Sequence, residues 1–277
     1  MTYCLGLCLD DGVVFASDSR TNAGVDYVTT YSKMHVFQPA QDRIFVILSA
    51  GNLATTQEVM NHIQRDIDYP DSNSVNLTNA RYMFEAAEYV GRISVQVQQE
   101  HSAALSSSGV SGETTLLIGG QIAGQPHSLM LIYPQGNYIT ASPETPYLQI
   151  GESKYGKPAL DRIASPDLTL HEGSRLCLVS LDATARSNIT VGPPFEIGVF
   201  EKDQTNLQNR CKFQENDPYL IKIRESWNNG IRNVFSELPE MPWSDNEQSN
   251  SNQEIPTSNQ EQQVQQQQVQ QQQILMS

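Results

Sequence analysis

Apolar and small residues alternate at the start of the chain in a way that predicts a β-hairpin. Over residues 3–9 the large apolar side chains occupy odd positions and small residues occupy even positions, a period of two that is typical of a strand. The Asp-Asp-Gly segment at 10–12 indicates a turn, and the apolar run 13–16 resumes the extended pattern. Two more strands are expected over 33–37 and 43–48.

The pattern then changes to helical spacing. Residues 52–66 and 78–101 place apolar side chains three or four positions apart, and Thr78 is the expected N-cap of the second helix. A Ser/Gly-rich loop is expected over 102–112. The remaining expected elements are strands at 114–118, 128–133, 138–140 and 195–200 and helices at 153–163, 174–186 and 219–238. Separate runs of strands and helices favour an α+β fold, with antiparallel sheets covered by helices.

Beyond residue 240 the pattern ends and the composition becomes rich in Asn, Gln, Ser and Glu. Such a segment cannot bury enough apolar surface to fold by itself. We therefore predict one folded domain over 1–240 and a disordered tail over 241–277, with a glutamine-mediated assembly contact as the alternative role of the tail.

Length and charge narrow the classes of function. A chain of 277 residues can bury a sizeable core. Its formal net charge of −14 argues against nucleic acid and anionic membranes as partners, because phosphate binding needs a basic surface. No run approaches the ~20 apolar residues of a membrane span, and the N-terminus lacks the basic and apolar regions of a signal peptide. These features predict a cytoplasmic protein that does not enter membranes.

The cysteines and histidines indicate neither disulfides nor a metal centre. Four cysteines in a chain of this length do not form a disulfide framework, and we expect them to be small, buried, reduced residues. The five histidines show no ligand-like spacing to the cysteines, so no metal and no cofactor is expected.

The candidate chemistry lies at the N-terminus. Thr2 follows the initiator Met1 and is small enough for methionine aminopeptidase to remove Met1. Thr2 would then carry a hydroxyl and a free α-amine on the same carbon. A hydroxyl becomes a useful nucleophile when a base lies beside it, and an α-amine has a pKa near 7.7–8.0, close to working pH. One residue can therefore supply both the nucleophile and the base.

Two charged residues are expected to support Thr2. The hairpin returns Asp18 to the level of Thr2, because its two strands are similar in length. Lys33 begins a following strand and can lie between Asp18 and Thr2. A buried ammonium there would lower the pKa values of the α-amine and of the hydroxyl, and Asp18 would keep that ammonium charged. Taken singly, Asp18 is also typical of a strand-end turn and Lys33 of a surface lysine.

Four motifs in this order resemble the proteasome β subunits and bacterial HslV. They are TYCLG at 2–6, DGVVFASDSR at 11–20, SKM at 32–34 and AG at 50–51. The stretches YSKMHVF at 31–37 and SNITVGPP at 187–194 resemble the bacterial Anbu subgroup. By this resemblance Thr2 is the nucleophile, Asp18 and Lys33 assist it, and the Gly51 N–H holds the oxyanion. Ser49 falls where the family lines its specificity pocket.

The resemblance also exposes two departures. The family usually has Gly-Ser-Gly where this chain has Gly151, Glu152 and Ser153, and its serine supports the terminal threonine. A glutamate at 152 adds negative charge beside the α-amine, which would raise the pKa of the amine. Ser153 could compensate, or it could be a helix N-cap. The family's Asp and Ser near the site are replaced here by Ser187 and Thr190.

The resemblance implies a four-layer αββα sandwich and a threonine-type endopeptidase of the N-terminal nucleophile class. It also implies a homo-oligomer, such as a ring, that admits peptides or unfolded proteins, with an ATPase unfoldase as a partner by analogy. Two alternatives remain open at this stage. The chain could be a ring-forming scaffold subunit with a weak or inactive site, or an amidohydrolase acting on small molecules.

Overall fold

The computed structural model describes residues 1–22, 28–71 and 73–242. The strands are β1 (Tyr3–Leu9), β2 (Gly12–Ser17), β3 (Arg20–Asn22), β4 (Val28–Thr30), β5 (Met34–Ala40), β6 (Arg43–Gly51), β7 (Thr114–Ile122), β8 (Ser128–Ile132), β9 (Tyr138–Thr140), β10 (Tyr147–Gly151), β11 (Phe195–Glu201) and β12 (Asn209–Phe213). The helices are α1 (Leu53–Asp68), α2 (Met83–Ser107), α3 (Lys157–Ile163), α4 (Leu170–Ser187) and α5 (Pro218–Ser236).

The expected N-terminal hairpin forms and lies inside the first sheet. This sheet has the order β10-β1-β2-β11-β12, and all of its neighbouring strands are antiparallel. β1 and β2 pair in the register Cys4 with Ser17 and Leu9 with Gly12, so the turn at Asp10 and Asp11 sets the register. β1 is buried along almost its whole length because other elements cover both of its faces.

The second sheet has the order β5-β6-β7-β8-β9 and is also antiparallel. Its central strand pairing joins β6 to β7 over nine residue pairs, from Arg43–Ile122 to Gly51–Thr114. The strands of this sheet follow one another in sequence except for the two helices inserted between β6 and β7. That insertion places α1 and α2 where they can cover one face of the sheet.

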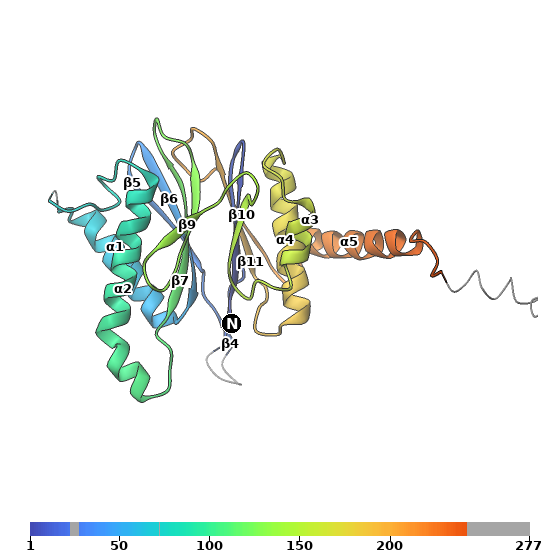
Figure 1. The fold of residues 1–277 in the computed structure, drawn as a ribbon, viewed down its shortest axis with the longest axis horizontal. Helices are drawn as coiled ribbons and strands as arrows, with labels where there is room; N and C mark the ends of the chain where they lie inside the picture. Colours follow the sequence, from blue (N-terminus) through green and yellow to red (C-terminus); the bar gives the residue numbers. More distant parts are fainter. Residues whose placement is uncertain (23–27, 72, 243–277) are drawn as a thin grey trace, which may run out of the picture. The chain divides into compact units, whose positions relative to one another are not determined.

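The structure has four layers, with α1 and α2 on one side, the two five-stranded sheets in the middle, and α3 and α4 on the other side (Figure 1). A hydrophobic cluster fills each of the three spaces between neighbouring layers. One cluster lies between α1, α2 and the second sheet and includes Phe45, Ile63 and Val90. Another joins the two sheets and includes Phe15 and Leu117. The third lies between the first sheet and the helices α3 and α4. Each five-stranded sheet therefore buries both faces, and the predicted α+β fold with αββα layering is confirmed.

Several predicted boundaries were wrong. The second helix begins at Met83 rather than 78, because Asn76 accepts hydrogen bonds from the N–H and the hydroxyl of Thr78 and holds Thr78 in a preceding turn. The same helix continues to Ser107, through part of the expected loop 102–112. α4 begins earlier than expected, because Thr169 and Glu172 form a capping box that caps its first turn.

The strands β3, β4, β10 and β12 were not expected. β10 has only five residues, and β12 is an exposed edge strand without apolar alternation. Neither pattern can be distinguished from a loop in the sequence. The cysteine prediction was correct in part: all four are free, and Cys4 and Cys177 are buried, but Cys8 is only partly buried and Cys211 is exposed.

The chain divides into two compact units, Met1–Asn228 and Asn229–Ser277. The first unit holds both sheets, and the side chain of Leu220 from the start of α5 belongs to its core. The boundary at residue 240 stays a prediction, and apart from residues 241 and 242 the predicted tail lies outside the described residues. None of the described helices combines the length and the apolarity needed to span a bilayer.

Candidate active site

The N-terminal residues are held between two neighbouring strands. The Tyr3 N–H donates to Asp18 Oδ1 at 3.0 Å, and the Asp18 N–H donates to the Tyr3 carbonyl at 3.1 Å. On the other side, the Thr2 carbonyl accepts a hydrogen bond from the Glu152 N–H at 2.8 Å. These contacts hold the backbone that follows Thr2 from two sides, and Thr2 itself is partly buried. Asp18 therefore lies opposite Tyr3, one residue beyond Thr2.

Lys33 and Asp18 form a buried ion pair beside this backbone. Lys33 Nζ lies 2.5 Å from Asp18 Oδ1, and the two side chains are 6% and 0% exposed. Lys33 Nζ also donates to the Arg20 carbonyl at 2.8 Å, and the Gly192 N–H donates to Asp18 Oδ2 at 3.3 Å. A buried charge is tolerated when it is paired and hydrogen-bonded, as both are here. The alternative of an exposed surface lysine is therefore wrong for Lys33.

Burial and charge act together on the ionisable groups of the site. Burial lowers the pKa of the Met1 α-amine, the positive charge of Lys33 lowers it further, and the negative charges of Asp18 and Glu152 act in the opposite direction. Burial also raises the pKa of Asp18, whereas Lys33 and the N–H groups of Tyr3 and Gly192 act against that rise. An amine at this end of the chain is thus biased toward its neutral form, which is the form that accepts a proton.

Gly51 occupies a position that only glycine suits. It ends β6 with a φ of +119°, and a Cβ atom there would lie 2.3 Å from the Glu113 carbonyl oxygen. Ser49, two residues earlier, is buried, and its N–H donates to the Lys33 carbonyl at 3.1 Å. The hydrogen bond from Ser49 therefore joins β6 to the segment that carries Lys33, and Gly51 lies two residues further along the same strand.

Glu152 is buried and bonded to a residue that the sequence analysis did not single out. Its Oε2 atom accepts from Asn188 Nδ2 at 3.0 Å, and Lys154 Nζ lies 3.8 Å from its Oε1 atom. Asn188 Oδ1 in turn accepts from both the N–H and the hydroxyl of Thr190. The structure therefore brings Glu152 and Thr190 together through Asn188.

Ser153 and Ser187 lie differently from these residues. Ser153 is partly buried, and its backbone carbonyl accepts from Gln149 Nε2 at 3.1 Å. Its expected role as a helix N-cap is wrong, because α3 begins at Lys157 with Gly156 at the N-cap. Ser187 is the exposed last residue of α4, whereas the next residue, Asn188, reaches Glu152.

Two further residues beside Asp18 were missed. The side-chain oxygens of Ser17 and Ser19 are buried, and neither has a hydrogen-bond partner among the described residues. Both stand in the DSR-containing motif on either side of Asp18, so their positions were visible in the sequence but their burial was not. Outside this site, Glu58, His62 and Glu100 of α1 and α2 are the described residues whose grouping could hold a metal ion.

Comparison with known proteins identifies the family. The model of the family described as "Proteasome subunit" matches residues 2–200. Anbu, an ancestral β-subunit from Yersinia bercovieri, is 42% identical with a TM-score of 0.79, covering 86% of this chain and 98% of that one. A structure of the helical assembly of the Anbu complex from Pseudomonas aeruginosa is 41% identical with a TM-score of 0.81, covering 87% and 99%.

A mutant Anbu from Hyphomicrobium sp. strain MC1 is 38% identical with a TM-score of 0.82, again covering 87% of this chain and 99% of the other. A comparison with curated proteins finds no match. The extent of the family match, the identities and the shared fold all agree with the motifs around Thr2, Asp18, Lys33 and Gly51. The chain belongs to the proteasome subunit family and is similar to its Anbu members.

Proposed function

We propose that the chain is a threonine peptidase that hydrolyses peptide bonds with Thr2 as an N-terminal nucleophile. The observation that carries this proposal is the buried Lys33–Asp18 pair, since Asp18 is bonded at once to Lys33 and to the N–H of the residue that follows Thr2. A buried charged pair is costly to maintain, and its position against the chain start favours a chemical role over a purely structural one.

The reaction would proceed as follows once Met1 is removed. The Thr2 hydroxyl attacks the carbonyl carbon of the substrate, and its proton passes to the Thr2 α-amine. The Gly51 N–H stabilises the oxyanion of the tetrahedral intermediate. The intermediate collapses, the leaving amine takes the proton, and an ester to Thr2 remains. Water hydrolyses this ester with the α-amine again acting as base, which restores the free hydroxyl.

The remaining residues have supporting roles in this proposal. Lys33 keeps the α-amine neutral by charge repulsion, Asp18 holds Lys33, and Ser49 lines the pocket for the substrate side chain. Glu152, with Asn188 and Thr190 behind it, places a negative charge near the amine, and Ser153 follows in the same turn.

Assembly and location are part of the same proposal. An Anbu complex of Pseudomonas aeruginosa forms a helical assembly, which supports self-association of this chain as well. We propose that such an assembly works in the cytoplasm on peptides or unfolded proteins. An ATPase unfoldase as partner rests on analogy with the family alone.

Intact mass spectrometry tests the nucleophile. We expect the purified protein to lack Met1 and to gain the mass of one probe molecule when treated with a β-lactone, because opening of the lactone by the Thr2 hydroxyl adds the whole probe. The Thr2→Ala variant keeps a residue small enough for removal of Met1 but has no hydroxyl, so it should gain no mass.

Three outcomes would contradict the proposal. Retained Met1 would leave the α-amine on the wrong residue, and an adduct that persists in Thr2→Ala would place the reactive group elsewhere. Loss of Met1 without any adduct would favour a scaffold subunit with an inactive site. The burial of Glu152 near the amine is the observation that favours this second function.

Glu152→Gln is expected to shift the pH dependence of labelling toward acid. The negative charge of Glu152 raises the pKa of the α-amine at the chain start, so its removal lowers that pKa. More of the amine is then neutral at low pH, and the rising part of the rate–pH profile moves to lower pH. Glutamine keeps a side-chain oxygen that can accept from Asn188 Nδ2.

Glu215→Gln serves as the control, because Glu215 is exposed and its substitution removes the same charge. We expect its profile to match that of the unmodified protein. A shift of the same size in both variants would attribute the effect to net charge and not to Glu152.

A further inference from the structure

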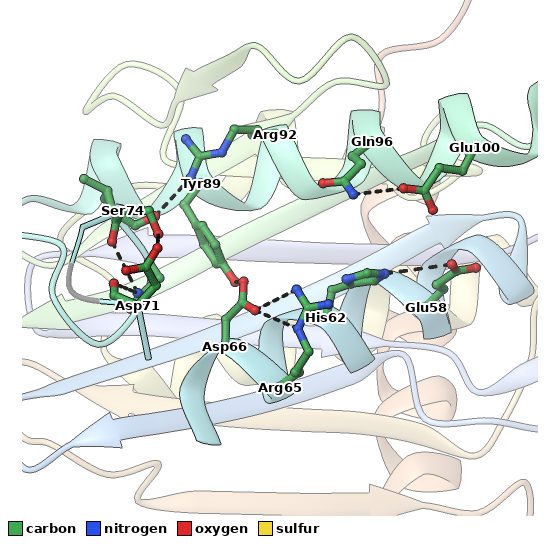
Figure 2. Close-up of polar contacts among 12 residues, drawn as sticks. Glu58, His62, Arg65, Asp66, Asp71, Ser74, Tyr89, Arg92, Gln96 and Glu100 are labelled. Atoms are coloured by element: carbon green, nitrogen blue, oxygen red, sulfur yellow. Dashed lines mark hydrogen bonds and ion pairs between the residues drawn. The ribbon is translucent and has the colours of Figure 1, made fainter. Parts of the chain in front are cut away.

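The helices α1 and α2 lie against each other in opposite directions. Asp66 of α1 accepts a hydrogen bond from Tyr89 of α2 at 2.9 Å, and Glu58 of α1 contacts His101 of α2 at 2.8 Å. The residue nearer the start of α1, Glu58, contacts the residue nearer the end of α2, His101, and the reverse holds for Asp66 and Tyr89. The two helices are therefore antiparallel. Polar side chains follow the line of contact between the two helices, as Figure 2 shows.

Three metal-binding side chains meet at one end of this contact. Glu58 and His62 are four residues apart on α1 and therefore lie on the same face of the helix. Glu100 reaches toward them from α2 (Figure 2). One ligand atom from each of the three residues lies within 4.8 Å of the other two. Two ligands of one tetrahedral ion, each about 2.0–2.2 Å from it, lie about 3.3–3.6 Å apart, so the three side chains would have to rotate closer together to hold an ion.

The charges of this cluster are unbalanced. Among the residues that the structure describes, no Lys or Arg forms an ion pair with Glu58 or Glu100. The partners of Glu58 are His62 at 3.9 Å and His101 at 2.8 Å, and Glu100 accepts from Gln96 at 2.9 Å. Neutral imidazole is the form of histidine that binds a metal ion, and the two carboxylates beside it would supply negative charge to such an ion.

The exposure of the cluster suits ion binding. The Glu58 side chain is 35% exposed and that of His62 is 20% exposed, so both are held by packing yet accessible. Glu100 is exposed and can rotate toward the other two side chains. An ion there would have three protein ligands and an open position for water, and the contact with His101 would orient the Glu58 carboxylate.

We propose that Glu58, His62 and Glu100 bind one divalent transition-metal ion that links α1 to α2. A histidine with two carboxylates favours Zn²⁺ and its first-row neighbours over Mg²⁺ and Ca²⁺, which take oxygen ligands. The site is independent of the proposed reaction at Thr2. Its role would be to stabilise the helix pair that covers the second sheet.

Calorimetric titration with ZnCl₂ tests the proposal on the full chain after treatment with a chelator. We expect one site per chain, and a Tm that rises by about 5–10 °C at a Zn²⁺ concentration about 100 times the Kd. His62→Asn and Glu100→Gln should each weaken binding at least about tenfold. Both side chains lie outside the main core, so circular dichroism of the metal-free variants should be unchanged.

Two control variants separate this site from other ligands of Zn²⁺. His171 is an exposed histidine on α4, and Cys211 is an exposed thiol, so His171→Asn and Cys211→Ser should bind Zn²⁺ as tightly as the unmodified chain. Co²⁺ in place of Zn²⁺ should give visible absorption bands that His62→Asn lacks. The proposal is overturned if the chain binds no Zn²⁺ at 1:1 stoichiometry, or if His62→Asn and Glu100→Gln bind it as the unmodified chain does.

Discussion

Replacing Lys33 by methionine is expected to lower the free energy of unfolding by about 3–5 kcal/mol, a large fraction of the stability of an ordinary domain. Methionine roughly matches the length of the lysine stem but removes the Lys33 ammonium, which lies 2.5 Å from Asp18 Oδ1 in the unmodified protein. A buried carboxylate that loses its partner keeps the full cost of its removal from water. Urea unfolding followed by circular dichroism measures the loss.

The loss of stability in Lys33→Met is expected to be smaller at pH 5 than at pH 8. Burial raises the pKa of Asp18, and removal of Lys33 raises it further, because Lys33 acts against that rise. Consider a carboxyl whose pKa is higher in the folded than in the unfolded protein. It stabilises the folded state fully at pH values below its unfolded-state pKa. That support is lost as pH rises through the folded-state pKa. Repeating the urea titration at both pH values measures the difference.

Lys157→Met is the matched control. Lys157 Nζ also lies 2.5 Å from a carboxylate, that of Asp161, but the two side chains are 52% and 47% exposed. Solvent screens such a pair, so stability should change far less than in Lys33→Met. The double variant Asp18→Asn/Lys33→Met should recover much of the stability while failing to react with the β-lactone. Equal losses in the two single lysine variants would contradict the importance of burial.

Gly151→Ala is expected to displace Thr2 and to abolish most of its labelling. Gly151 pairs with Tyr3 across β1 and β10 and has a φ of +81°. A Cβ atom at this position would lie 1.9 Å from the Thr2 carbonyl oxygen and 2.8 Å from its carbonyl carbon. No rotation of a side chain relieves an overlap with backbone, so the strand end that carries Thr2 must move. A displacement of 1 Å at a reacting group can slow a reaction about 100-fold.

Gly124→Ala is the control that separates the effect of atomic overlap from the effect of backbone strain. Gly124 has a φ of +78°, close to that of Gly151, but a Cβ atom there meets nothing within 4 Å. Gly124→Ala should lower the free energy of unfolding by only about 1–2 kcal/mol, the cost of placing an alanine in the left-handed region, and should leave labelling unchanged. The measurements are urea unfolding and the rate of adduct formation by intact mass. Normal labelling in Gly151→Ala would show that Thr2 does not depend on this strand pairing.

The local elements of the fold were mostly readable from the sequence. The alternation over 3–9 and the turn at Asp10 and Asp11 gave the correct hairpin, and helical spacing gave α1 nearly to its ends. Such elements depend on interactions between residues close in sequence, which leave a periodic pattern. α4 shows a signal that was overlooked, because the Thr169–Glu172 capping box marks its start directly.

The candidate site was readable in part for the same reason. Thr2 and Asp18 adjoin the paired strands β1 and β2, so the length of one hairpin largely determines how they meet. Lys33 precedes β5 of the other five-stranded sheet and reaches Asp18 from there. The side of the site formed by Glu152 and Asn188 was not readable in this way. Glu152 reaches Thr2 only because the short strand β10 pairs with β1, and β10 leaves too few residues for a pattern.

By itself, the sequence determined the nucleophile candidate, its two charged neighbours, the glycine at 51 and the α+β class. Tertiary structure decided which residues distant in sequence come into contact. Asn188 is hydrogen-bonded to Glu152, the Gly192 N–H to Asp18, and His101 to Glu58. The physical reason is that short-range order follows from backbone sterics and periodic burial. Contacts across layers form only when whole faces of sheets and helices pack together, so the identity of a single residue does not predict its partner in another layer.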